Sequence, residues 1–190
     1  MTARLLGGVL VGGQSRRMGR PKQLIEIGGT TMIEHVVAAL GEEVDEILLL
    51  GAGPVPLVLE SLSRVADAEE CRGPMAGVLG AMRAEPEASW IVAACDMPLL
   101  RPEAVRWLVS RRRQGAWVVF PTLEGFVEPL LSLYEPDARA LLEEAAAAGE
   151  HALRHLASNP RVVTAEAPES LRRCWFSANT PQEILSLCTG

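Results

Sequence analysis

The chain has 190 residues, of which 48% are hydrophobic and 22% are charged, and its formal net charge is −6. Its length and apolar content fit one globular domain, and its acidic balance argues against broad binding to nucleic acid, which needs clustered Lys and Arg. No apolar run is long enough to cross a membrane, and the four cysteines form no CxxC pair, so we expect a cytoplasmic protein without membrane association.

The first 120 residues alternate between strand-like and helix-like segments. Buried strands are predicted where apolar, β-branched-rich runs are bounded by turn residues, at 5–11, 46–50, 90–95 and 116–120. Helices are predicted between them from the spacing of apolar positions, at 32–40, 75–84 and 102–113. This order predicts an α/β fold with three layers, in which a mostly parallel, twisted sheet carries helices on both faces.

Beyond Phe120 the alternation is less regular. We expect a loosely patterned segment over 125–134, helices near 136–148 and 150–157, and a strand near 161–165. Because no linker divides the chain, residues 1–190 are predicted to form a single domain.

Two helix starts are marked by capping residues. Thr31 and Glu34 have capping-box spacing at the start of the first helix. Thr180 and Glu183 repeat this spacing around Pro181, and proline is favoured at the first helical position. A last helix is therefore expected to begin at Pro181.

The first predicted strand runs into a glycine-rich loop, which begins at Gly12 and Gly13 and ends at Lys22. Glycines allow backbone N–H groups to surround a phosphate, and Ser15, Arg17 and Lys22 add hydrogen-bond donors and positive charge. Lys22 is the only lysine beside seventeen arginines, which indicates a position that requires a compact ammonium. The loop has neither Walker A nor GxGxxG spacing, so we predict a phosphate site of another kind.

A second chemically informative position follows the predicted strand at 90–95. Asp96 is one of four aspartates, and Pro98 turns the chain away shortly after it. Ligands of open α/β sheets bind beyond the carboxyl ends of the strands, so Asp96 should share a crevice with the glycine loop. We expect Asp96 to bind Mg²⁺ together with substrate phosphates. Its alternative role is to cap the next helix, for which Arg101-Pro102 is a better start.

Two other glycine-containing segments are considered as possible nucleotide-binding segments. Asp67 precedes Gly73 and Pro74, and the small residues as far as Gly77 permit close approach to a base or ribose, although Gly-Pro is also an ordinary turn signal. Gly51-Ala52-Gly53 lacks the third glycine of a dinucleotide-binding motif, so we interpret it as an ordinary turn.

These segments together resemble the molybdenum cofactor guanylyltransferase family. The matching motifs, in the order of the family, are Leu10-Val11-Gly12-Gly13 with Ser15, Arg17-Met18-Gly19 and Lys22, Gly73-Pro74-Met75-Ala76-Gly77, Asp96-Met97-Pro98, Glu128-Pro129-Leu130 and Asn179-Thr180-Pro181. The likeness spans nearly the whole chain. There are two departures: the family often has Ala where Val11 stands, and a second Asn where Ser177 stands.

The resemblance implies a Rossmann-like nucleotidyltransferase fold and a role for each matching residue. Gly12, Gly13 and Lys22 would hold a triphosphate, Asp67 would contact the guanosine, and Asp96 would bind Mg²⁺. The remaining nucleotide-binding residues are expected to be Leu10, Val11, Ser15, Arg17, Gly73, Pro74 and Gly77, and the acceptor side is expected to include Glu128 and Asn179. Residues 1 to about 120 would form the nucleotide-binding half, and about 121 to 190 the acceptor-binding half.

The activity implied by the resemblance is transfer of GMP from GTP to molybdopterin with release of pyrophosphate, in which Lys22 and Asp96 are catalytic. A phosphate monoester acceptor is already ionised near neutral pH, so no general base is needed. The alternatives are a cytidylyltransferase for the same pterin, a sugar-phosphate nucleotidyltransferase, and a nucleotide-sensing or partner-binding protein on this fold. GTP and molybdopterin would be the small-molecule partners, with transient contacts to cofactor-biosynthesis or acceptor proteins.

Several conspicuous residues are interpreted as structural. His151 and His155 have i, i+4 spacing on a predicted helix, but no third ligand accompanies them, so zinc is disfavoured. Three consecutive arginines, at 111–113, are expected to be a solvated helix terminus. The tryptophans lie in or beside apolar runs and are expected in the core or at an interface.

Overall fold

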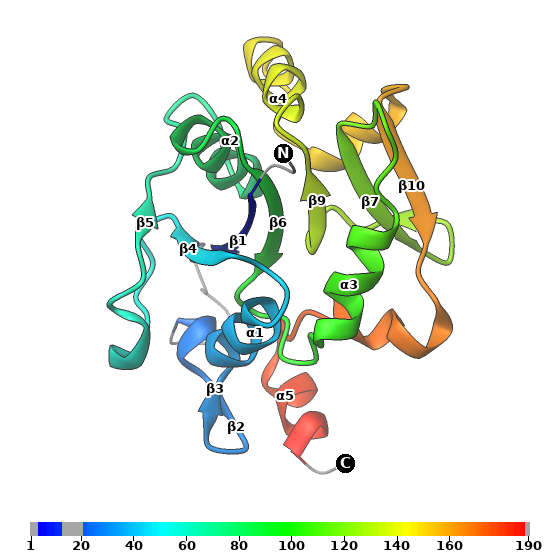
Figure 1. The fold of residues 1–190 in the computed structure, drawn as a ribbon. Helices are drawn as coiled ribbons and strands as arrows, with labels where there is room; N and C mark the ends of the chain where they lie inside the picture. Colours follow the sequence, from blue (N-terminus) through cyan, green and yellow to red (C-terminus); the bar gives the residue numbers. More distant parts are fainter. Residues whose placement is uncertain (1–3, 13–20, 189–190) are drawn as a thin grey trace.

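The computed structural model describes residues 4–12 and 21–188, and a twisted sheet forms its centre (Figure 1). Within those residues the sheet has eight strands. Seven follow in the order β10 (Val162–Glu166), β7 (Val118–Leu123), β9 (Ser132–Tyr134), β6 (Ser89–Ala94), β1 (Leu5–Leu10), β4 (Glu46–Leu50) and β5 (Arg64–Val65), and β8 (Phe126–Val127) pairs with β7. β1 is parallel to β4 and β6, whereas β9 is antiparallel to β6 and β7. The predicted mostly parallel sheet is confirmed.

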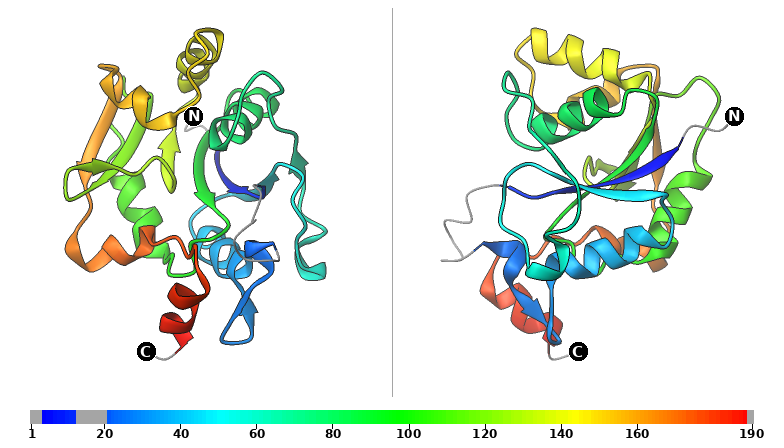
Figure 2. Two further views of the ribbon diagram at one scale, coloured as in Figure 1. Left: turned by 180° about the vertical axis from the view of Figure 1, so that it is seen from behind. Right: turned by 60° about the vertical axis from the view of Figure 1, so that its left-hand side comes forward.

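Helices cover both faces of the sheet, as the sequence predicted (Figures 1 and 2). One face carries α2 (Pro74–Ala84) and α4 (Ala138–Ala147), and the other carries α1 (Met32–Gly41) and α3 (Pro102–Ser110). The remaining pieces are the antiparallel pair β2 (Glu26–Ile27) and β3 (Thr30–Thr31), α5 (Pro181–Cys188), and four 3₁₀ turns within the described ranges: η1 (Lys22–Leu24), η2 (Leu57–Leu59), η3 (Leu153–Ser158) and η4 (Glu169–Trp175).

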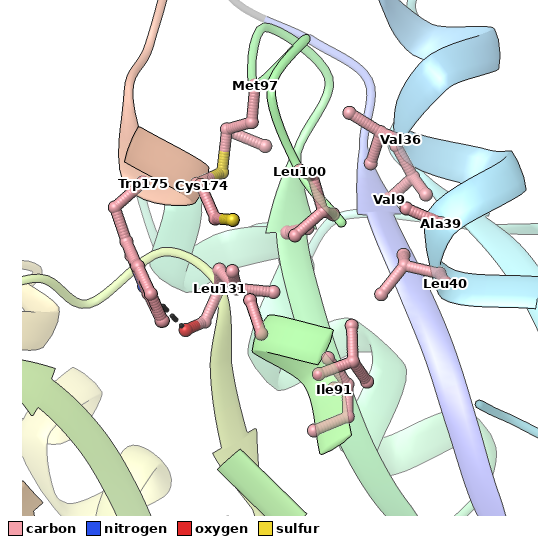
Figure 3. Packing of buried hydrophobic residues seen from close by; sticks show 14 of the residues in the cluster. Val9, Val36, Ala39, Leu40, Ile91, Met97, Leu100, Leu131, Cys174 and Trp175 are labelled. Carbon is pink, nitrogen blue, oxygen red and sulfur yellow. Dashed lines mark hydrogen bonds between the residues drawn. The ribbon is translucent and has the colours of Figure 1, made fainter. Parts of the chain in front are cut away.

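Strand β6 lies in the middle of the sheet, and every one of its residues is buried because helices cover both faces. Its side chains alternate between the two cores: Ile91 packs in the cluster beneath α1 and α3, and Trp90 and Val92 pack beneath α2 and α4. Figure 3 shows Ile91 facing Leu40 of α1 across the first of these clusters. A strand covered on both faces has a continuous apolar sequence, which is the pattern from which β6 was predicted.

Both predicted capping boxes are present. The Thr31 N–H donates to Glu34 Oε2 at 2.9 Å, and the Thr31 side chain caps the third helical N–H of α1. The Thr180 N–H donates to Glu183 Oε2 at 2.8 Å, and the Glu183 N–H donates to Thr180 Oγ1 at 3.3 Å. Helix α5 begins at Pro181, as expected.

The predicted helix near 150–157 is wrong in kind. The chain forms a 3₁₀ turn there, η3, which begins at Leu153. Asn159 after it is extended, with φ −75° and ψ 134°, because the following Pro160 disfavours a helical conformation. His151 lies outside the turn, so His151 and His155 do not share a helix face. The His155 Nδ1 instead lies 2.9 Å from Glu150 Oε2.

The prediction of a solvated terminus at residues 111–113 is wrong for Arg112. Helix α3 ends at Ser110, so Arg112 leaves the helix and reaches across the sheet. Its Nε and Nη2 donate to the two carboxylate oxygens of Glu135 at 2.6 and 2.8 Å, and Nη2 also donates to the buried Ser89 Oγ at 2.5 Å. This fork-shaped contact joins the chain before β7 to the start of β6 and the end of β9.

Glycine at position 80 is required by the close approach of α2 to the chain after β5. A Cβ added at Gly80 would lie 2.2 Å from the carbonyl oxygen of Ala66, and backbone cannot move aside as a side chain can. We expect Gly80→Ala to lower the free energy of unfolding by about 1–3 kcal/mol, measured by urea denaturation. The matched control is Gly41→Ala, since a Cβ there would meet only Ile47 Cδ1, at 3.5 Å. Equal urea midpoints for the two variants would contradict this account.

Candidate active site

A cavity of about 430 Å³ opens where the carboxyl ends of β1, β4 and β6 meet. This is the edge of an open α/β sheet at which ligands bind. Within the described part of the chain, it is lined by Leu10, Val11, Gly12, Lys22, Gln23, Leu50, Asp67, Gly73, Pro74, Ala94, Cys95, Asp96 and Leu130. Residues far apart in the sequence therefore contribute to one concave surface.

Lys22 and Asp96 face one another across this cavity. The Lys22 Nζ lies 3.1 Å from Asp96 Oδ2, and the two side chains are 22% and 16% exposed. Lys22 also donates to Asn179 Oδ1. Lys22 is placed by η1 just after Pro21, whereas Asp96 follows β6, and its carbonyl accepts the Ala178 N–H at 2.9 Å. A positive and a negative group thus meet at the carboxyl end of the central strands.

The start of the glycine loop is anchored between β1 and β4. The Val11 N–H donates to the Leu50 carbonyl at 2.8 Å, and the Val11 carbonyl accepts the Gly53 N–H at 2.9 Å. Gly12 follows as an exposed residue of the cavity wall, and no heavy atom that the structure describes lies within 4 Å of a Cβ added there. The predicted phosphate-binding residues Gly13, Ser15 and Arg17 lie outside the described residues.

Asp67 lines the cavity and lies close to Gly51 and Gly77, which are not among the lining residues. A Cβ added at either Gly51 or Gly77 would come within 3.4 Å of Asp67 Oδ1. At Gly77 the added Cβ would also lie 2.4 Å from Leu10 Cδ2, so glycine there keeps α2 close to the end of β1. Gly73 precedes α2 with a φ of 62°, a conformation that favours glycine, and Pro74 is the first residue of the helix. Of the predicted nucleotide residues in this region, Asp67, Gly73 and Pro74 line the cavity, whereas Gly77 does not.

The predicted acceptor-side residues lie on a loop between β8 and β9 and on the segment before α5. The carbonyls of Glu128, Pro129 and Leu131 accept hydrogen bonds from the buried side chains of Ser132 at 3.1 Å, Tyr134 at 3.3 Å and Trp175 at 3.2 Å, respectively. Figure 3 shows the bond from Trp175.

This loop brings Leu130 into the cavity wall, whereas Glu128 is half-buried and is not among the lining residues. Burial raises the pKa of the Glu128 carboxyl above its ordinary value. Asn179 likewise does not line the cavity, but it touches the site through Lys22.

The cavity offers few protein ligands for a metal ion. No group of three or more His, Cys, Asp or Glu side chains that could hold a metal occurs among the described residues. Burial, followed by the nearby Asp96 charge, raises the pKa of the Cys95 thiol to about 12. Asp96, the carboxylate beside Lys22, suits a hard cation that takes most of its ligands from substrate phosphates and water.

Three contributions to the site were missed by sequence reasoning. Gln23 lines the cavity, whereas the sequence predicted a site role for its neighbour Lys22 and none for Gln23 itself. The turn at Gly51-Ala52-Gly53, interpreted as ordinary, packs against Val11 and Asp67. Trp175, expected as a core or interface residue, also donates to the Leu131 carbonyl. Gln23 had no signal in the sequence beyond its position next to Lys22.

A family model described as a MobA-like NTP transferase domain matches residues 7–165. The chain belongs to this family. The match includes every described lining residue of the cavity and ends before Trp175 and Asn179. The resemblance inferred from the sequence is confirmed, and the protein is a nucleotidyltransferase.

Individual relatives of this MobA-like family member agree with the match. A probable molybdenum cofactor guanylyltransferase of Thermococcus gammatolerans is 34% identical over 98% of this chain and 100% of its own. The crystal structure of molybdopterin-guanine dinucleotide biosynthesis protein A from Archaeoglobus fulgidus has 26% identity and a TM-score of 0.78, with 96% of each chain covered.

A 2-C-methyl-D-erythritol 4-phosphate cytidylyltransferase from Thermus thermophilus shares the fold. Its TM-score is 0.66 at 19% identity, with 99% of this chain and 98% of that chain covered. In the described part of this family member, no helix has the length and apolar character needed to cross a membrane.

Proposed function

We propose that the protein transfers GMP from GTP to molybdopterin, releasing pyrophosphate, and that it requires Mg²⁺. The observation that carries the proposal is the pair Lys22 and Asp96, whose charged atoms lie 3.1 Å apart in the cavity at the carboxyl ends of β1 and β6. The identity of the acceptor is inferred from relatives named as probable molybdenum cofactor guanylyltransferases. Two of them align with 98% and 94% of this chain.

The chemistry needs positioning and charge neutralisation more than proton transfer. An oxygen of the acceptor phosphate would bond to the α-phosphorus of GTP as the bond from that phosphorus to the β-phosphate oxygen breaks, in line with it. That acceptor oxygen is already ionised near neutral pH, so the site needs no general base. The fact that the Cys95 thiol stays protonated and that Glu128 is outside the cavity wall agrees with this requirement.

Lys22 would neutralise charge on the α-phosphate and on the departing pyrophosphate. Its ammonium contacts Asp96 and Asn179, and a phosphate oxygen bound there would join or replace these contacts. Gly12 would offer its backbone N–H to the same phosphates, because it is exposed and no described side chain lies close to it. Asp96 would hold Mg²⁺, which when bound supplies positive charge beside the phosphates.

The two halves of the chain contribute different sides of the cavity. We propose that residues 1 to about 120, which supply Gly12, Lys22, Asp67 and Asp96, form the nucleotide-binding half. Residues from about 121 would form the acceptor-binding half, because the loop before β9 and the segment around Asn179 meet the cavity from the β6 side. Asp67, enclosed by Gly51 and Gly77, would contact the guanosine.

Nucleotide selectivity tests the guanylyl assignment. With Mg²⁺ present, GTP is expected to raise the midpoint of thermal unfolding more than CTP or UTP at equal concentration. A ligand that binds only the folded state stabilises it by an amount that grows with the ratio of ligand concentration to Kd, so the nucleotide that binds most tightly gives the largest shift. Pyrophosphate release with GTP and purified molybdopterin would then establish turnover. A larger shift with CTP would indicate a cytidylyltransferase, and tight GTP binding without turnover would indicate a nucleotide sensor.

A further inference from the structure

Gln23 is a buried amide in the wall of the cavity. It is 4% exposed, and it is one of the few polar side chains among the described residues that are buried to this degree. Its Nε2 donates to the Pro54 carbonyl at 3.0 Å. Burying an amide oxygen without a hydrogen-bond partner lowers the stability of the folded state, so a partner for the Gln23 oxygen is expected.

Lys22 and Gln23 are consecutive, but their side chains reach opposite neighbours of β1. Lys22 contacts Asp96, which follows β6, and Gln23 contacts Pro54, which follows β4. The sheet order β6, β1, β4, β5 therefore places Lys22 on the Asp96 side of β1 and Gln23 on the side toward Asp67. With the polyphosphate at Lys22 and Asp96 and the guanosine at Asp67, as in the proposed function, the nucleoside lies on the same side as Gln23.

The turn at 51–54 that Gln23 contacts is held from three directions. Arg64 Nη1 donates to the carbonyls of Gly51 and Gly53 at 3.3 and 3.0 Å. A Cβ at Gly53 would lie 2.7 Å from the Val11 carbonyl oxygen and 3.0 Å from Gln23 Nε2, so the turn packs directly on β1 and on the amide. Its position is thus fixed without any help from a ligand.

The same contacts determine which amide atom of Gln23 can bind a ligand. Because one N–H of Nε2 is held by Pro54, the amide is oriented and keeps its Oε1 and second N–H for a ligand, and none of the described residues donates a hydrogen bond to Oε1. A carbonyl oxygen repels phosphate and accepts from N–H and O–H groups. In a nucleoside triphosphate those groups are found on the base and the ribose.

We propose that Gln23 is a specificity-determining residue that binds the nucleoside part of the donor nucleotide through Oε1. The inference rests on the proposed function, which puts the triphosphate at Lys22. The fixed turn at 51–54 aligns the amide, and the base or ribose donates to it. Two adjacent residues would then bind different parts of one ligand: Lys22 the triphosphate and Gln23 the nucleoside.

The test compares Gln23→Met with two control variants by titration with Mg²⁺ and GTP, ITP, 2′-deoxyGTP, 3′-deoxyGTP or inorganic triphosphate. Gln114→Met removes an exposed amide, and Arg64→Met loosens the same turn but keeps the Gln23 amide. Gln23→Met is expected to weaken GTP about tenfold, the loss of one hydrogen bond, and to leave inorganic triphosphate unchanged. One analogue that lacks a donor should lose a similar factor in the wild type and nothing further in Gln23→Met.

The outcomes separate this inference from the proposed function. Equal weakening of GTP and inorganic triphosphate in Gln23→Met would overturn it, as would a Gln114→Met variant that loses the same analogue discrimination. Arg64→Met is expected to show a smaller loss of the same kind as Gln23→Met, because a looser turn aligns the amide less well. The wild type is also titrated with 2-aminopurine riboside triphosphate, which lacks the N1–H that ITP keeps. If this analogue, ITP and both deoxy analogues all bind the wild type as tightly as GTP does, Oε1 has no nucleoside partner. A wild type that prefers CTP would instead overturn the guanylyl assignment, and the ratio between wild type and Gln23→Met for CTP would still test the amide.

Discussion

Lys22→Met is expected to lower kcat/KM for nucleotidyl transfer about a thousandfold, because one preorganised donor at a developing charge contributes a factor of this order. Lys22 is the residue that joins Asp96 and Asn179 in the cavity. Its side chain is partly exposed, so the fold should tolerate its loss, and the midpoint of urea unfolding should change little. Initial rates of pyrophosphate release, measured with GTP and molybdopterin, provide the readout.

Two comparisons make the Lys22 result specific. Lys22→Arg keeps the charge but is also expected to fail, since a planar guanidinium cannot take the place of an ammonium between Asp96 and Asn179. Arg4→Met removes an exposed cation paired with Glu46 outside the cavity and should leave the rate unchanged. A Lys22→Met enzyme with more than a tenth of the wild-type rate would show that the lysine has no catalytic role.

Asp96→Asn is expected to lower kcat at least a hundredfold and to raise the Mg²⁺ concentration needed for half-maximal rate. Asparagine has nearly the same shape and can still accept from Lys22, but it lacks the negative charge that a divalent ion requires. The Asp96 carbonyl, which accepts the Ala178 N–H, is untouched by the substitution. Loss of activity would therefore report the carboxylate and not the loop.

The Mg²⁺ dependence of the rate distinguishes the metal role of Asp96 from a structural one. Asp137→Asn is a suitable control, because Asp137 is exposed at the start of α4 and its side chain makes no capping hydrogen bond. The control should keep both the wild-type kcat and the wild-type Mg²⁺ requirement. An Asp96→Asn enzyme that kept the wild-type Mg²⁺ curve with a reduced kcat would contradict metal binding by this residue.

The central half of the fold was predictable because its signals are local. A run such as the one ending at Ala94 is apolar throughout, since both faces of β6 are covered, and capping boxes such as that of Thr31 and Glu34 occur within a few residues. Ligands gather at strand ends in such sheets, so the residues after β1 and β6 could be identified as neighbours.

The remaining features depend on contacts that no local pattern encodes. Arg112 was misinterpreted because its partner, Glu135, is 23 residues away and the helix ends earlier than its apolar spacing suggested. Strand β9 has three residues and is too short to predict from alternation. Gln23 could not be assigned because its contact with Pro54 exists only if β4 lies beside β1, which is a property of strand order.

The contacts of residues 175–179 have a consequence for how the enzyme becomes active during its own synthesis. Trp175 holds the loop at Leu131, Ala178 binds the Asp96 carbonyl and Asn179 meets Lys22, yet all three are translated after every strand of the sheet. A nascent chain that has already folded its sheet on the ribosome therefore still lacks these three ties. Catalytic competence should arise only when residue 179 has cleared the exit tunnel.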